Sequence, residues 1–192
     1  MNYWDRKSIE YNDKFYSGNR GGLDLKTKLL LGDSKGDVME WGCGTGEITR
    51  RIAPYFRTML ALDSSREMIN LAPPLDNVEY EIGDCQESDF GGFDLICGNY
   101  ILMYCGDLRE KIYNQLNPGG RFAFIEINSF HPLAFCKTKI GWIKRRLDIS
   151  ESAHSFDPFR LAREYRSVGF KNVRWRCIGV SSSFFIEGYR QP

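Results

Sequence analysis

The chain of 192 residues has almost no excess of either charge. Its 26 lysines and arginines are balanced by 25 aspartates and glutamates, which leaves a formal net charge of +1. A protein that binds nucleic acid through its phosphates usually carries a clear positive excess. The charge balance therefore gives no support to nucleic acid as a partner.

Long apolar runs are also absent. No stretch approaches the roughly 20 consecutive apolar residues with which a helix crosses a bilayer. Residues 1–16, MNYWDRKSIEYNDKFY, are charged and aromatic, which is unlike a secretory signal. We therefore expect a cytoplasmic protein.

Cysteine pairs at metal-binding or redox spacing are missing as well. None of the six cysteines forms a C-x-x-C pair, and the chain has only two histidines. Several of the cysteines lie in apolar, strand-like segments. Buried free thiols without a bound metal are therefore expected, with a metal or disulfide framework as the weaker alternative. The six are Cys43, Cys85, Cys97, Cys105, Cys136 and Cys177.

Internal repeats, low-complexity tracts and linkers are absent, and a hydrophobic content of 42% is ordinary for one globular domain over 1–192. Apolar segments alternate with helical patterns, and short connections between them require parallel strands. The prediction is an α/β, doubly wound sheet with helices on both faces and a ligand beyond the carboxyl ends of its strands. Strands are expected at 37–41, 58–63, 78–83, 93–99 and 121–127, and helices at 3–16, 22–31, 47–56, 64–71 and 107–116.

The regular alternation of strand and helix patterns stops after residue 127. A segment over 128–155 precedes a helix near 158–167 and two final strands within 171–180 and 182–190. Because so few residues separate these two strands, they are expected to pair as an antiparallel hairpin. The C-terminal part, 156–192, is thus a helix followed by a hairpin.

Three glycines mark the end of the first strand. In VMEWGCGTGE, Gly42, Gly44 and Gly46 follow the strand and open the next helix. Glycine permits a positive φ and lets a ligand cross the backbone closely, and amides at a helix start favour anionic groups. A tight turn without a ligand is the alternative. The spacing is G-x-G-x-G, with Glu47 in place of the last glycine of the dinucleotide fingerprint, which disfavours a nicotinamide-dependent oxidoreductase.

Two aspartates end the neighbouring strands. Asp63 can accept hydrogen bonds from both hydroxyls of a ribose, or it can cap the helix that follows. Asp84 can bind the exocyclic amine of an adenine, or it can be an ordinary turn residue. Met68, one turn into the helix after Asp63, can pack on an adenine face or belong to the core.

These segments resemble the class I S-adenosylmethionine-dependent methyltransferases, in particular their small-molecule branch. The matching features are VMEWGCGTGE, LALDSSREMINLA, GDCQE, FDLICGN and LNPGGRFAFIE, in the family's order and spacing. The resemblance is strong over the core, 36–127, and moderate in the C-terminal part. It implies a Rossmann-like, seven-stranded sheet with an antiparallel last strand, and S-adenosylmethionine as the cofactor.

The resemblance also implies roles for individual residues. Glu40 and the glycine loop would hold the methionine moiety, and Asn99 would approach the sulfonium. The N-terminal helices, 1–32, would cover the cofactor, although a helix that simply packs on the core is an equal alternative. The implied cofactor-binding residues are Glu40, Gly42, Cys43, Gly44, Gly46, Asp63, Ser64, Met68, Asp84, Cys85, Asn99 and Tyr16.

The expected reaction is an in-line methyl transfer driven mainly by orientation, in which a general base is needed only when the acceptor must lose a proton. His131, after the fifth strand, and Tyr100, after the fourth, are the candidates for that base or for substrate contact. For His131, a plain loop histidine is the alternative. A protein that binds S-adenosylmethionine without catalysis is the second functional hypothesis, and a nicotinamide-dependent oxidoreductase is the third.

The acceptor is expected to be a small or amphiphilic metabolite, such as a lipid, isoprenoid or glycan intermediate. Within the substrate-recognition insertion, 128–155, the stretch 130–147 combines five cations with many apolar residues and no acid. Such a stretch can lie on an anionic membrane, cover an acidic amphiphile, or pack as a helix pair on the core. Nucleic acid is disfavoured again, because GNYILMY at the end of the fourth strand lacks the prolines of base-methylating enzymes.

Overall fold

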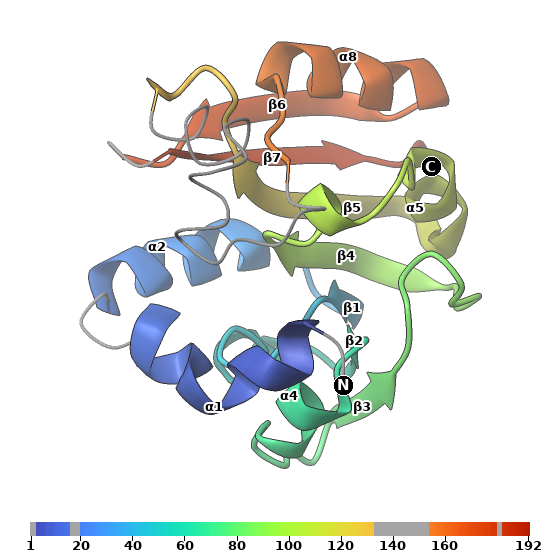
Figure 1. The fold of residues 1–192 in the computed structure, drawn as a ribbon. Helices are drawn as coiled ribbons and strands as arrows, with labels where there is room; N and C mark the ends of the chain where they lie inside the picture. The colour runs from blue at the N-terminus through green and yellow to red at the C-terminus, as the bar shows by residue number, and fades with distance from the viewer. Residues whose placement is uncertain (1–2, 16–19, 133–153, 180–181) are drawn as a thin grey trace.

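A computed structural model describes residues 3–15, 20–132, 154–179 and 182–192 of the chain. Its centre is a sheet of seven strands in the order β3-β2-β1-β4-β5-β7-β6. The first five strands pair in parallel, whereas β7 runs antiparallel to β5 and β6 (Figure 1). The predicted α/β sheet with its antiparallel last strand is confirmed. The strands are β1 (Asp37–Trp41), β2 (Thr58–Asp63), β3 (Val78–Ile82), β4 (Phe93–Asn99), β5 (Leu116–Ile127), β6 (Lys171–Cys177) and β7 (Ser183–Tyr189).

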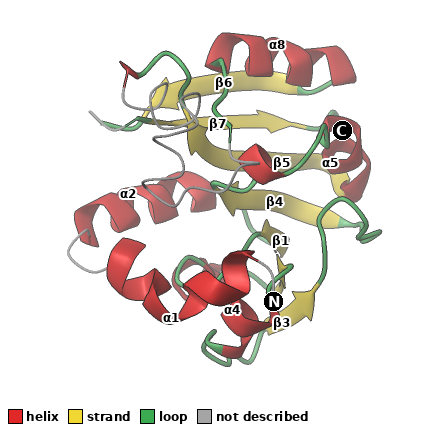
Figure 2. Cartoon of the chain, viewed as in Figure 1, coloured by secondary structure: helices red, strands yellow, loops and turns green. Residues whose placement is uncertain are grey.

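Helices cover both faces of this sheet (Figure 2). One apolar cluster joins Met39 and Phe122 of the sheet to α5 and α8, and the other joins Val38 and Leu95 to α2 and α3. Neighbouring strand residues such as Val38 and Met39 face opposite sides, as the pleat requires. The helices are α1 (Tyr3–Phe15), α2 (Arg20–Leu31), α3 (Thr49–Ile52), α4 (Arg66–Asn70), α5 (Arg109–Gln115) and α8 (Pro158–Val168), with short 3-10 turns η1 (Ala53–Tyr55) and η2 (Leu102–Tyr104).

The strand order reverses between β1 and β4, which are neighbours in the sheet although β2 and β3 lie between them in the chain. In open α/β sheets such a reversal leaves a crevice outside the carboxyl ends of the strands, where ligands bind. The loops after β1 and β4 meet at this point. We therefore expect the ligand site to include the residues that follow Trp41 and Asn99.

Two predicted boundaries are wrong. The helix expected over 47–56 divides into α3 and η1, because Pro54 has no N–H to continue the α-helical ladder. β5 starts at Leu116 rather than at residue 121: Leu116 pairs with Phe93, and the pairing resumes only at Arg121 opposite Leu95. The Asn-Pro-Gly-Gly sequence between these pairs forms an irregularity inside the strand instead of a loop before it.

Arg121 fastens α2 to the sheet. Its guanidinium donates to the carbonyls of Leu29 and Leu30 at the end of α2 and pairs with Glu187 of β7, 2.8 Å away. These carbonyls have no partner within the helix, so a buried donor satisfies them. Both ionic groups of the pair are almost fully buried. The contact holds α2 in a defined position beside β5.

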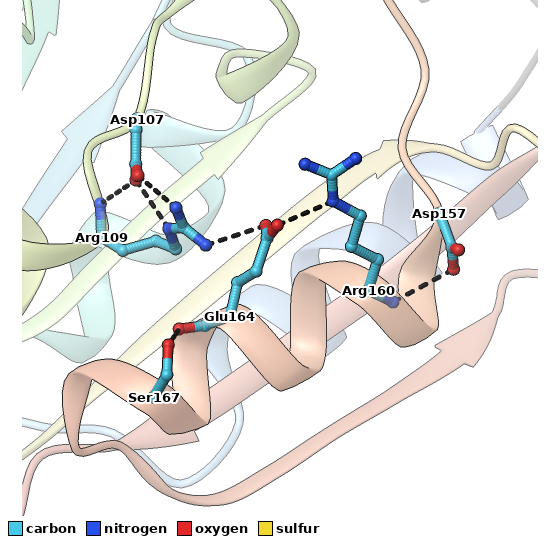
Figure 3. A network of polar contacts seen from close by, with 6 residues as sticks. All are labelled: Asp107, Arg109, Asp157, Arg160, Glu164 and Ser167. Carbon is cyan, nitrogen blue, oxygen red and sulfur yellow. Dashed lines mark hydrogen bonds and ion pairs between the residues drawn. The ribbon is translucent and has the colours of Figure 1, made fainter.

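A second, more exposed ionic network joins α5 to α8 (Figure 3). Arg109 pairs with Glu164 of α8 at 2.8 Å, and Arg160 donates to the same carboxylate from one turn away. Asp157 caps the start of α8 by accepting from two backbone amides. Gly169, with a φ of 119°, ends this helix. These contacts hold α8 against β6, away from the place between β1 and β4 where the strand order reverses.

Candidate cofactor and acceptor site

The glycine loop after β1 adopts positive φ at all three positions. The values are 67° at Gly42, 55° at Gly44 and 74° at Gly46, a region that side chains other than glycine enter with strain. A Cβ on Gly42 would lie 2.8 Å from Ile101, and one on Gly46 would lie 3.0 Å from Pro73. At Gly44 the nearest atom is 3.7 Å away, on Tyr11. Packing of the protein thus requires Gly42 and Gly46, while a Cβ on Gly44 would make only an ordinary van der Waals contact with α1.

Asp63 braces this loop from the end of β2. Its Oδ2 accepts the amide of Gly44 at 2.8 Å, and its Oδ1 accepts the amide of Ser65 at 2.9 Å. Burial raises the pKa of Asp63, and hydrogen bonds from the amides of Ser65, Gly44 and Ser64 oppose that shift. A carboxylate has about four acceptor positions, so at least one remains for a ligand. The carboxylate lies beside Gly44, the glycine of the loop where a Cβ would meet no atom closer than 3.7 Å.

Glu40 lies fully buried on β1, just before the loop. The hydroxyl of Thr49 donates to its Oε2 at 2.6 Å, and no lysine or arginine of the described residues pairs with it. Burial raises the pKa of Glu40 to about 8, and the negative charge of Asp63 adds to the effect. A cation bound nearby would favour the charged form again. Glu40 therefore suits a ligand that carries an ammonium group.

The helix α1 covers the loops on this side. Asp5 accepts a hydrogen bond of 2.7 Å from Ser65, the residue that caps α4. The ring of Trp4 packs edge-on against Tyr104 of η2, with centroids 5.1 Å apart. Figure 1 shows α1 lying alongside α4, close to the N-terminal end of the chain. The helix thus lies between the loop after β2 and the loop after β4.

The loop after β3 holds Asp84 and Cys85 in different environments. Asp84 is exposed and accepts the amide of Gln86 at 2.8 Å, as a turn aspartate does. Cys85 is buried, with its sulfur 2.8 Å from that of Cys105. The roles of both residues at an adenine stay predictions. The expectation of buried thiols is confirmed at Cys43, Cys85, Cys97 and Cys105 but is wrong at Cys177, which is exposed on the edge strand β6.

Unpartnered polar atoms occur at the carboxyl ends of β4 and β5. Among the residues described, four buried side-chain atoms have no hydrogen-bond partner: Asn99 Oδ1, Glu126 Oε2 and His131 Nδ1 at or after these strand ends, and Gln115 Oε1 at the end of α5. Glu126 uses its other oxygen to accept the amide of Leu102 at 2.7 Å. Buried polar atoms are normally paired, so a group of exceptions at one end of a sheet is typical of a place where a ligand or water binds. His131 lies in the turn that its own amide closes onto Asn128.

Tyr100 follows Asn99 in a backbone conformation that is rare for tyrosine, with a φ of 60°. Its hydroxyl lies 2.5 Å from that of Ser183 at the start of β7. The ammonium of Lys26, on α2, lies 4.2 Å from the centre of its ring. Sequence reasoning missed Lys26 and Ser183. The spacing of Lys26 could have indicated it. The lysine follows Leu23 by three residues and precedes Leu30 by four, which puts it on the buried side of α2.

Comparison with known proteins places this geometry in a family. A family model described as "Methyltransferase domain" matches residues 16–174. The chain belongs to the class I S-adenosylmethionine-dependent methyltransferases. The family resemblance that the motifs carry is confirmed. S-adenosylmethionine is the cofactor of this family.

Two curated relatives of this methyltransferase domain have named substrates. Over 93 residues it is 41% identical to trans-aconitate 2-methyltransferase of Deinococcus radiodurans, an alignment that covers 45% of this chain and 36% of the relative. Over 149 residues it is 28% identical to malonyl-[acyl-carrier protein] O-methyltransferase of Erwinia billingiae, covering 71% and 59%. The chain thus spans less than two thirds of the length of either relative.

Two solved structures share the fold. The DhpI complex with SAH superposes with a TM-score of 0.72 at 22% identity, covering 99% of this chain and 94% of that one. Phosphoethanolamine N-methyltransferase 2 of Haemonchus contortus, in complex with S-adenosyl-L-methionine, gives 0.78 at 14% identity, covering 98% and 57%. At these identities the likeness establishes the architecture of the methyltransferase domain.

The residues around the loop fit the family's cofactor. Gly44 carries no side chain where the loop passes under α1, Asp63 keeps an acceptor position, and Glu40 is a buried carboxyl that a cation would stabilise. These residues would hold the ribose and methionine parts of S-adenosylmethionine, and Asn99, at the end of the neighbouring strand β4, offers a buried oxygen. Ser64 lies between Asp63 and the cap of α4, and Met68 is buried within that helix.

Some predicted features lie outside the described residues. Tyr16 is one of them, and most of the basic stretch 130–147 is another, since residues 133–153 are not described. Within the described residues no helix is long and apolar enough to span a membrane. The roles expected for Tyr16 and for the basic stretch stay predictions.

Proposed function

We propose that this methyltransferase domain transfers the methyl group of S-adenosylmethionine to a small or amphiphilic metabolite. The observation that carries the proposal is the glycine loop itself, in which Asp63 binds the amide of Gly44 and a Cβ on Gly44 would meet only Tyr11 of α1, at 3.7 Å. When bound, the cofactor supplies a methyl group activated by a positively charged sulfur. The protein contributes the alignment of donor and acceptor, which by itself removes much of the barrier to such a displacement.

The residues of the chain divide this work between the two ends of the crevice. Glu40 and Asp63 place negative charge and hydrogen-bond acceptors on the cofactor side. Asn99, at the end of β4, would approach the sulfonium between the two sides, and His131 and Tyr100 follow β5 and β4 on the side proposed for the acceptor. α1 restricts the access of water, which strengthens polar interactions beneath it. His131 and Tyr100 remain the candidates for a general base.

The named relatives support an acceptor that carries a carboxyl group. One relative is named for trans-aconitate, a small carboxylic acid, and the other for malonyl-[acyl-carrier protein], whose malonyl group ends in a free carboxyl. Lipid, isoprenoid and glycan intermediates remain proposals that rest on the basic stretch 130–147. A protein that binds the cofactor without transferring its methyl group is the alternative.

The first test adds a single methyl group at Gly44. The substitution Gly44→Ala adds a Cβ that the protein itself accommodates at 3.7 Å from Tyr11. The matched control is Gly119→Ala, another glycine at positive φ with nothing within 4 Å and far along the chain in β5. We expect Gly44→Ala to weaken S-adenosylmethionine binding at least tenfold in calorimetry, while both variants lose similar thermal stability.

Equal affinity of the two variants would contradict the placement of the cofactor at this loop. Transfer of a labelled methyl group to a panel of metabolites then separates an enzyme from a protein that only binds. Binding without any transfer would favour the alternative.

A further inference from the structure

Lys26, on α2, places a positive charge over the ring of Tyr100, which follows the carboxyl end of β4. It is half-buried on the packed stripe of α2, between Leu23 and Leu30, which are both buried. Among the described residues no acid forms an ion pair with it, and Asp24, two residues earlier, pairs with Arg51. A partly buried ammonium loses hydration, and an anion that binds beside it restores the lost stabilisation.

Tyr100 fixes the place where such an anion would bind. The ammonium lies 4.2 Å from the centre of the tyrosine ring, in the geometry of a cation–π contact. The amide of Tyr100 donates to Ile125 at 2.8 Å, which holds the backbone in its unusual conformation. Strain of this kind persists where the surrounding structure enforces it, and it is concentrated at functional sites.

Ser183 fixes the hydroxyl of that ring. The two hydroxyl oxygens lie 2.5 Å apart, and Ser183 is only 3% exposed. When Ser183 donates in this pair, the phenol hydrogen of Tyr100 is free to donate to a ligand. Lys26, Tyr100 and Ser183 come from α2, the loop after β4 and β7, so three distant segments converge on one polar group.

The position of this group assigns it to the acceptor side. Tyr100 and Ser183 lie after β4 and at the start of β7, whereas Asp63 and Gly44 lie at the end of β2 and just after β1, on the other side of the reversal point. We propose that Lys26 and Tyr100 bind a carboxylate of the methyl acceptor, with Ser183 as a positioning residue. This inference rests on the proposed function. One ammonium and one hydroxyl match a singly charged carboxylate, while a phosphate usually recruits several cations or amides.

The experiment measures carboxylate binding directly, without turnover. The protein is saturated with S-adenosylhomocysteine and titrated with succinate, glutarate and citrate, with succinamide and methylphosphonate as comparisons. We expect at least one of the three carboxylates to bind, and succinamide and methylphosphonate to bind at least tenfold more weakly. Lys26→Met should weaken carboxylate binding at least tenfold, and Lys26→Arg should recover part of it.

The matched control is Lys28→Met, on the exposed side of the same helix. It should leave carboxylate binding unchanged, and Tyr100→Phe should reduce it less than Lys26→Met does. Affinity for S-adenosylhomocysteine should be unchanged in all of these variants. If Lys26→Met weakens that affinity instead, the lysine binds the carboxylate of the cofactor and the inference is wrong.

Two further results would overturn it. The inference fails if none of the three carboxylates binds to protein that does bind S-adenosylhomocysteine, and also if methylphosphonate binds better than they do. A wild-type protein that does not bind S-adenosylhomocysteine at all would instead refute the proposed function. The two failures are therefore distinguishable.

Discussion

Glu40 lies fully buried on β1, and its pKa of about 8 is far above the usual 4.5. Between these two pH values the folded protein holds a proton that the unfolded chain has lost. The contribution of Glu40 to stability is therefore complete below pH 4.5 and is lost as the pH rises through 8. A neutral glutamine keeps the hydrogen bond from Thr49 and does not titrate.

We therefore expect Glu40→Gln to gain stability relative to the wild type as the pH rises from 4.5 to 8. Thermal unfolding of both proteins across this range measures the difference. Glu79→Gln, at an exposed position on β3, is the control and should show no such trend. Binding of S-adenosylmethionine near pH 7 should also release protons from the wild type and fewer from Glu40→Gln. A stability difference that does not change with pH would refute the assignment.

At the scale of elements, the position of α2 decides where Lys26 lies. Arg121 holds the end of this helix through the carbonyls of Leu29 and Leu30, and it pairs with Glu187 in the interior. Glu164 makes a comparable set of contacts between α5 and α8, but at the surface (Figure 3). The two networks have similar distances and very different burial, so their contributions to stability should differ.

Arg121→Met leaves Glu187 buried with a single arginine partner and leaves the carbonyls of α2 unpaired. Removing one member of a buried ion pair usually costs roughly 3–5 kcal/mol, whereas an exposed pair contributes about 1 kcal/mol or less. We expect urea unfolding to show this contrast between Arg121→Met and Glu164→Gln. Only the Arg121 variant should also lose carboxylate binding, because α2 carries Lys26. Similar losses of stability in both variants would contradict the importance of burial.

At the scale of the whole molecule, the site lies where the strand order reverses between β1 and β4. The parallel strands deliver the glycine loop, Asp63 and Asn99 to one edge of the sheet, and α1 lies across that edge. Asp5 fastens α1 to the cap of α4 at 2.7 Å, close enough to Asp63 for its charge to raise the pKa of that residue. The position of α1 therefore affects the charge of Asp63 at the edge of the crevice.

We expect S-adenosylhomocysteine to slow amide hydrogen exchange in α1 severalfold, because a ligand beneath the helix adds contacts to it. Asp5→Ala should speed exchange in α1 when no ligand is bound. Glu10→Ala, at an exposed position on the same helix, should leave it unchanged. Exchange in α1 that does not respond to the ligand would show that this helix only packs on the core.

Much of the cofactor side could be predicted from local sequence. The strands at 37–41, 58–63 and 93–99 match the structure, since short apolar runs bounded by turns have few other ways to bury their side chains. Gly44 and Asp63 could also be predicted from local sequence, because each lies at or just after the end of a predicted strand. The start of β5 was not predictable in this way, since its pairing with Phe93 continues across residues that usually terminate strands.

The sequence by itself determined the order of the strands along the chain, the glycine loop and the family. These depend on neighbours in the chain, whose spacing sets the periodicity and the turns. Only the tertiary structure decided that Lys26, Tyr100 and Ser183 meet, because β7 inserts antiparallel beside β5 and Arg121 holds α2 against them. Contacts between residues so far apart in the chain arise from packing of the whole sheet, which no local pattern records.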